Sequence, residues 1–225
     1  MKEYIKKSSQ KRVGEFPIVG WGINLVVADP ITNNVSPTSV IERLKAKIPH
    51  KYIENIDAIY VGKFKHLEKM DHNASYMDGV IYVTSEQDSE YDMLDDIVHE
   101  IGHAVEELYG MSMYADKKIE REFLGKRHRL YDLLASEGYD VEPYQVDFLS
   151  PDYNQRLDSF FYMEVGYPFM EMLSSTLFYS PYGATSLREY FANGFESIYF
   201  SNNGNRLKKI SPILYNKIKS IEGNE

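Results

Sequence analysis

The sequence contains no cysteine. Disulfide bonds and thiolate metal sites are therefore excluded, so any metal ion must be held by histidine, aspartate or glutamate. Long apolar runs are also absent: no segment is suited to crossing a bilayer, and the basic N-terminal residues are not followed by the apolar stretch of a secretory signal. We therefore expect a protein without a membrane partner, cytoplasmic or particle-associated rather than classically secreted.

Basic residues are in deficit, with 25 Lys and Arg against 34 Asp and Glu and a formal net charge of -9. This charge argues against nucleic acid as a partner, because phosphates would be repelled. The hydrophobic content of 43% and the charged content of 26% are ordinary for a globular protein. We predict a single domain over residues 1–225, without internal repeats or a clear linker.

The pattern of residues changes along the chain from strand-like to helical. We expect residues 1–15 to be a mobile, basic arm, and β-branched and aromatic stretches predict strands at 56–64 and 78–84. From residue 91 onward apolar residues recur at helical spacing, and Gly110 is the predicted end of the first long helix. Residues 126–129 look like a solvated basic helix face. The fold class is α+β: a small N-terminal mixed sheet and a helical C-terminal lobe.

The segment "DDIVHEIGH" carries the main chemical signal. His99 and His103 lie one helical turn apart on one face, where two imidazoles can reach a single metal ion at about 2.0–2.1 Å. Glu100 is rotated off that face, so it can act on a metal-bound water instead of binding the metal. These are the mechanics of H-E-x-x-H on a helix, and we predict one catalytic zinc ion.

We expect the third protein ligand to be a carboxylate. A longer pattern with a third histidine fails, because Glu106 and Tyr109 stand where its glycine and histidine should be. Two candidates remain open on the residues alone, Glu122 and Glu189. Glu122 follows His103 at the spacing of the large zinc aminopeptidases, although Arg121 stands where those enzymes usually carry asparagine.

The combination of "HEIGH", a later "YG" pair and "EYFANGFE" resembles the catalytic domain of anthrax lethal factor and the related Pro-Pro endopeptidases. The resemblance implies a zincin-like metallopeptidase fold with an active-site helix. It also implies that Glu189 is the third zinc ligand and that Tyr182 points into the site. A phenol there can donate a hydrogen bond to a developing oxyanion.

Two features of the sequence depart from the family pattern, one residue and one spacing. The residue one turn after the ligand, often acidic in such enzymes, is Asn193, which would orient a ligand histidine without a charge, and Glu196 could take that role instead. The stretch between His103 and Tyr182 is much longer than in lethal factor. We therefore predict an inserted helical segment over about residues 139–178.

The substrate side is predicted from the strand just before the histidine helix. In zinc peptidases of this build an edge strand pairs with the extended substrate through backbone hydrogen bonds. The candidate strand consists of Gly79, Val80, Ile81, Tyr82 and Val83.

The sequence thus predicts a zinc-dependent endopeptidase that acts on a peptide or protein, with Glu100 as general base. One alternative is an aminopeptidase-like enzyme that uses Glu122 as third ligand. Another is a catalytically inactive zincin-fold protein with a binding or structural role, for example as a component of a phage particle.

Overall fold

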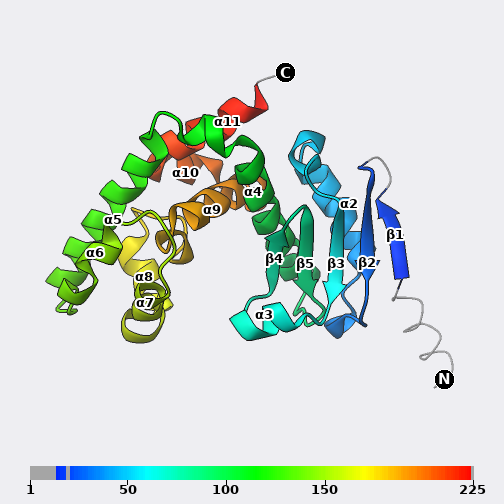
Figure 1. Cartoon of the computed structure of the whole chain (residues 1–225), viewed down its shortest axis with the longest axis horizontal. Helices are drawn as coiled ribbons and strands as arrows, with labels where there is room; N and C mark the ends of the chain where they lie inside the picture. Colours follow the sequence, from blue (N-terminus) through cyan, green and yellow to red (C-terminus); the bar gives the residue numbers. More distant parts are fainter. Residues whose placement is uncertain (1–13, 19–20, 224–225) are drawn as a thin grey trace. The chain divides into compact units, whose positions relative to one another are not determined.

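The computed structural model describes residues 14–18 and 21–223 (Figure 1). The chain divides into two compact units, Met1–Leu108 and Tyr109–Glu225, and the boundary falls inside one long helix, α4 (Glu90–Tyr114). Most of the predicted N-terminal arm lies outside the described residues, but Gly14 and Glu15 belong to the first strand. Within the described ranges, no helix combines the length and the apolar character needed to cross a membrane.

The first unit is built on a five-stranded mixed sheet with the order β1-β2-β3-β5-β4. The outer pairs β1–β2 and β4–β5 are antiparallel, whereas β2–β3 and β3–β5 are parallel. The strands are β1 (Gly14–Ile18), β2 (Ile23–Val27), β3 (Ala58–Gly62), β4 (Ala74–Met77) and β5 (Val80–Thr84). The α+β class and the mixed sheet that the sequence predicts are confirmed.

The parallel pairs require connections that cross over the sheet, and helices supply them. Between β2 and β3 the chain forms α2 (Pro37–Lys47). The residue before it, Ser36, caps the helix, and its Oγ accepts a hydrogen bond from the Ser39 N–H at 3.4 Å. Between β3 and β5 the chain forms α3 (Lys65–Met70) and then β4. Two short 3-10 turns, η1 (Thr32–Asn34) and η2 (His50–Ile53), flank α2.

One face of the sheet is buried in strict alternation along the strands. The buried strand residues are Ile23, Leu25, Val27, Ile59, Val61, Ile81 and Val83. Helix α2 buries Val40, Ile41 and Leu44, and α4 buries Leu94, Ile97, Val98 and Ile101. The prediction that Gly110 ends the histidine helix was wrong: the helix continues to Tyr114, because a glycine with helical backbone angles costs only about 1 kcal/mol.

The second unit is helical. Its elements are α5 (Lys118–Ser136), η3 (Glu142–Tyr144), α6 (Gln145–Phe148), α7 (Gln155–Ser159), the π-helix η4 (Phe160–Val165), α8 (Tyr167–Ser174), η5 (Tyr182–Ala184), α9 (Leu187–Tyr199), α10 (Gly204–Ile210) and α11 (Pro212–Glu222). The predicted inserted segment, about residues 139–178, therefore consists of short helical pieces rather than one long helix.

Two basic side chains of α5 are buried, which corrects the prediction of a solvated basic face at residues 126–129. The guanidinium of Arg127 has no exposed surface. It donates to the carbonyl oxygens of Ser150 at 2.7 Å and Asp147 at 2.9 Å, and it lies 5.3 Å from the ring centre of Phe123. Arg127 thus holds the start of the inserted segment against α5.

Replacing Arg127 with alanine should lower the free energy of unfolding by about 3 kcal/mol or more, because two buried carbonyl groups lose their donors and a cavity opens. The matched control is Arg129→Ala, an exposed arginine on the same helix, with an expected change within about 0.5 kcal/mol. Urea unfolding followed by circular dichroism measures both. Equal losses in the two variants would contradict a buried structural role for Arg127.

The ammonium group of Lys126 sits in a buried polar network. It donates to the Leu177 carbonyl oxygen at 2.8 Å and to Ser211 Oγ at 2.5 Å, and it lies 4.8 Å from the ring centre of Tyr190. Burial lowers the pKa of Lys126 to about 7, although the charge of Glu122 raises it. The neutral amine is therefore favoured inside the folded unit.

This shift predicts a rise of stability with pH. In the unfolded chain Lys126 keeps its proton up to its ordinary pKa of 10.5, so above pH 7 the unfolded state binds more protons and the folded state is favoured. Relative to Lys126→Met, the wild type should gain stability between pH 7 and pH 9, by at most about 1.4 kcal/mol per pH unit. Urea unfolding of both proteins at several pH values measures this difference. A difference that stays constant from pH 6 to pH 9 would contradict the buried, pKa-shifted lysine.

Candidate metal centre

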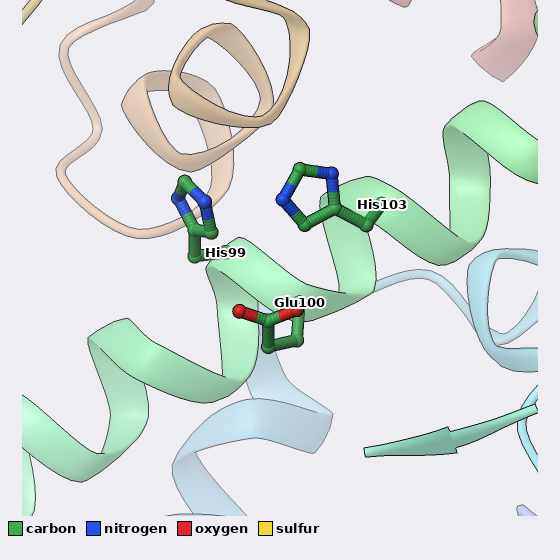
Figure 2. Close-up of side chains that lie close together, drawn as sticks. All are labelled: His99, Glu100 and His103. Atoms are coloured by element: carbon green, nitrogen blue, oxygen red, sulfur yellow. The ribbon is translucent and has the colours of Figure 1, made fainter. Parts of the chain in front are cut away.

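His99 and His103 stand on the same side of α4, as Figure 2 shows. Their ring centres lie 5.0 Å apart with an interplanar angle of 82°. One ligand atom from each of His99, Glu100 and His103 can be chosen so that all lie within 4.8 Å of one another. His103 and Glu100 are buried and His99 is half-buried. The group could therefore hold a metal ion, as the helical spacing predicts.

The carboxylate of Glu100 is fixed to the edge of the sheet. Its Oε2 accepts a hydrogen bond from the backbone N–H of Tyr76 in β4 at 2.7 Å, and only 7% of the residue is exposed. Figure 2 shows the carboxylate on a different side of the helix from the two imidazoles. The backbone of Tyr76 is part of this site, and it could not be predicted from the sequence because the bond does not involve the side chain of Tyr76.

Two further acids of α4 border the site. The Glu106 carboxylate Oε2 lies 3.8 Å from His103 Nδ1, which favours the other ring nitrogen, Nε2, as the metal-binding atom. Asp96 accepts a hydrogen bond from Gln87 Nε2 at 3.0 Å. Burial raises the pKa of Asp96 to about 6, and the charge of Glu100 raises it further while the hydrogen bond from Gln87 lowers it. The sequence offered a signal for both acids, since each lies within one turn of a predicted site residue.

The donor set fits a first-row divalent cation. Two imidazoles and nearby carboxylates, without any thiolate, are the ligands that zinc takes in hydrolytic sites. Two histidines on one helix leave coordination positions open, and the sequence predicts that a carboxylate from another element fills one of them.

The predicted ligand Glu189 is the third residue of α9 in the second unit. The helix begins there because Ser186 Oγ accepts a hydrogen bond from the Glu189 N–H at 3.1 Å. Tyr182 opens the short turn η5 just before α9, and both Tyr182 and Glu189 are half-buried. Because the two histidines belong to the first unit, the meeting of Glu189 and Tyr182 with them stays a prediction.

Within the second unit, Asn193 is bound to the turn before α9, and its predicted contact with a ligand histidine stays a prediction. Its Oδ1 accepts a short hydrogen bond from Ser180 Oγ, and a Cβ at Gly183 would lie 3.2 Å from the same oxygen. The buried amide of Asn193 therefore holds the Tyr182–Gly183 turn against α9. Glu196, the predicted substitute, lies half-buried one turn further along that helix.

Helix α9 is also fixed from its other side by close packing. A Cβ at Gly194 would lie 2.5 Å from Leu214 Cδ2 of α11, so only glycine allows the two helices to approach this closely. The position of Glu189 and the shape of the turn before it are thus set by contacts within the second unit.

Glu122, the alternative third ligand, has a structural role in this fold. Its carboxylate accepts hydrogen bonds from the Tyr190 hydroxyl at 2.9 Å and from the N–H groups of Ile213 at 2.9 Å and Leu214 at 3.1 Å. These N–H groups lie in the first turn of α11, where the side chain of the cap residue, Ser211, accepts no hydrogen bond from the helix backbone. Glu122 therefore caps α11, which argues against the aminopeptidase-like ligand assignment.

The predicted substrate strand was placed wrongly in the sheet. Residues Val80, Ile81, Tyr82 and Val83 do form a strand, β5, and Gly79 precedes it in the turn. However, β5 pairs with β3 on one side and with β4 on the other, so its backbone groups are used within the sheet. The edge strand next to the histidine helix is β4.

Comparisons with known proteins identify no family for the chain. No protein-family model matches it, and no solved structure matches it. Among curated proteins it is similar to Transcriptional activator protein DAL81 of Saccharomyces cerevisiae, with 29% identity over 163 residues. The match covers 64% of this chain and 17% of the yeast protein.

Zinc analysis of purified variants tests the ligand set. We expect one zinc ion per wild-type chain after loading and desalting, and loss of that ion in His103→Ala and Glu189→Ala. Glu122→Gln should keep the ion but lose about 1–2 kcal/mol of stability, because the cap of α11 is weakened. Mass-spectrometric metal analysis and urea unfolding measure these outcomes. Loss of zinc in Glu122→Gln together with full zinc in Glu189→Ala would reverse the assignment.

Proposed function

We propose that the protein is a zinc-dependent endopeptidase. The observation that carries the proposal is the arrangement on α4: two imidazoles converge on one side, and the buried Glu100 beside them is held at the edge of a sheet. The resemblance of the Tyr182 and Glu189 segment to lethal factor supports the same reading. His99, His103 and Glu189 would hold the ion.

Bound zinc would supply a Lewis acid that polarises the peptide carbonyl and acidifies a water molecule. The residues of the chain would do the rest. Glu100 would accept the proton of the attacking water and pass it to the leaving amine. Since Oε2 accepts the bond from Tyr76, Oε1 is the oxygen suited to this transfer. The hydroxyl group of Tyr182 would donate a hydrogen bond to the developing oxyanion.

The substrate would pair with β4 rather than with β5. The Tyr76 N–H points away from β5 toward Glu100, and in an antiparallel ladder the backbone groups of Ala74 point to the same outer side. Because Glu100 already takes the Tyr76 N–H, an extended peptide would pair with the remaining outward backbone groups of this edge, at Ala74, and would thus lie next to the proposed general base. In this placement, the Tyr76 N–H connects the proposed substrate-binding strand directly to the proposed proton acceptor, Glu100.

A role in transcription, which the name of the yeast protein states for that protein, has less support here. The net charge of -9 disfavours contact with DNA phosphates. The similarity also covers only a small part of the yeast protein.

The proposed function is tested with Glu100→Gln. Glutamine can still accept the Tyr76 hydrogen bond, so the fold and the zinc content should be unchanged, whereas cleavage should fall by a factor of about 100 or more. The measurement is cleavage of a peptide library read by mass spectrometry, with the exposed Glu137→Gln as control.

Equal cleavage by wild type and Glu100→Gln would remove Glu100 from the mechanism. Absence of cleavage by the zinc-saturated wild type would favour the alternative of a catalytically inactive binding or structural protein.

A further inference from the structure

The inserted segment is attached directly at the start of α9. The carbonyl oxygen of Pro151 accepts a hydrogen bond from the Leu187 N–H at 2.8 Å. Leu187 lies two residues before Glu189, so this bond places the segment beside the part of the second unit that carries the predicted site residues.

A carboxylate and two phenols form a cluster on this segment. Asp158 of α7 accepts hydrogen bonds on both oxygens, from Tyr153 at 2.8 Å and from Tyr167 at 2.9 Å. Each tyrosine also interacts electrostatically with one predicted site residue of the second unit, Tyr153 with Glu189 and Tyr167 with Tyr182. Burial and Asp158 raise the pKa of Tyr153 to about 12, and the charge of Glu189 adds to this shift. Tyr167, whose pKa is raised for the same reasons, interacts in turn with Tyr182.

An unusual backbone element produces this cluster. Helix α7 continues into the π-helix η4 (Phe160–Val165), which ends at Gly166 with a φ of 83°. π-helical turns are rare and occur often at functional sites. Here the π-helix and the left-handed glycine bring Tyr167, the first residue of α8, back to the carboxylate of α7.

The chemistry of the cluster favours apolar over basic ligands. Each oxygen of Asp158 accepts one phenol hydrogen, so fewer of its acceptor positions are left for an ion pair with a substrate. Aromatic residues are exposed at the cluster: Tyr153 is 51% exposed, and Tyr162, which lies beside the cluster at 5.5 Å from Tyr167 between ring centres, is 63% exposed. Such ring surfaces bury apolar side chains.

We propose that Tyr153 and Tyr167, held in place by Asp158, form a substrate-binding wall on the inserted segment that selects an apolar side chain of the peptide. This inference rests on the proposed peptidase function. It gives the long insertion a role: the segment adds a specificity-determining surface next to Glu189 and Tyr182.

The test uses binding, so that it does not depend on cleavage. A peptide array with one position varied at a time is probed with zinc-loaded Glu100→Gln protein, and with the same protein carrying Tyr153→Ala, Tyr153→Phe or Tyr144→Phe. Tyr144→Phe is the matched control, because its hydroxyl also donates to a carboxylate of the inserted segment, Glu164, outside the cluster.

We expect one array position to prefer Leu, Ile, Phe or Tyr. Tyr153→Ala should reduce that preference about tenfold, Tyr153→Phe should weaken it because the ring is no longer held, and Tyr144→Phe should leave it unchanged. Zinc content should be the same in all four proteins, since none of these tyrosines is a proposed ligand.

Several results would overturn the wall. The first two are the absence of peptide binding and an apolar preference that persists in Tyr153→Ala. The other two are loss of zinc in the Tyr153 variants and a preference for Lys or Arg that Asp158→Asn abolishes. Failure of the peptidase proposal looks different: the apolar preference would depend on Tyr153, while the zinc-saturated wild type would cleave none of the bound peptides.

Discussion

The hydrogen bond between the Tyr76 N–H and Glu100 determines how the candidate site is arranged. The spacing of His99, Glu100 and His103 along α4 is fixed by helix geometry alone, but the rotation of that helix against the sheet is not. Buried residues such as Ile97 and Ile101 orient α4 through packing, and the bond to Tyr76 sets the rotation at the edge. With the carboxylate fixed there, the two imidazoles lie together on a neighbouring side of the helix, with ligand atoms within 4.8 Å of an oxygen of Glu100.

The second unit supports its predicted site residues by a separate set of contacts. Asn193 holds the turn that carries Tyr182, and Gly194 lets α11 pack directly on α9. Glu122 then caps α11 and also binds the hydroxyl of Tyr190, the residue after Glu189. Glu122 and Asn193, which the sequence suggests as a zinc ligand and as a partner of one, thus hold α9 in place, the helix that carries the other ligand candidate, Glu189.

The parts of the fold that could be predicted from sequence are those with local signals. Helical spacing is enough to bring His99 and His103 together, and alternating β-branched residues are enough for β3 and β5. The edge strand β4 could not be predicted, because "ASYM" is short and its residue types show no clear apolar–polar alternation, and without β4 the sequence places β5 at the edge. Lys126 and Arg127 looked solvated beside other basic residues, since their partners lie far along the chain. Whether Glu189 binds zinc stays a prediction, as it depends on both units.

The capping of α11 from α5 has a consequence for how this chain tolerates shortening. The last helix carries none of the proposed catalytic or ligand residues, so it looks dispensable. Removing the chain from Ser211 onward would, however, leave the carboxylate of Glu122 with the Tyr190 hydroxyl alone and the amine of Lys126 with the Leu177 carbonyl oxygen alone among the hydrogen-bond partners described above. Tags, fusions and protease sites should therefore follow this helix rather than replace it, since the integrity of the whole second unit depends on its first turn.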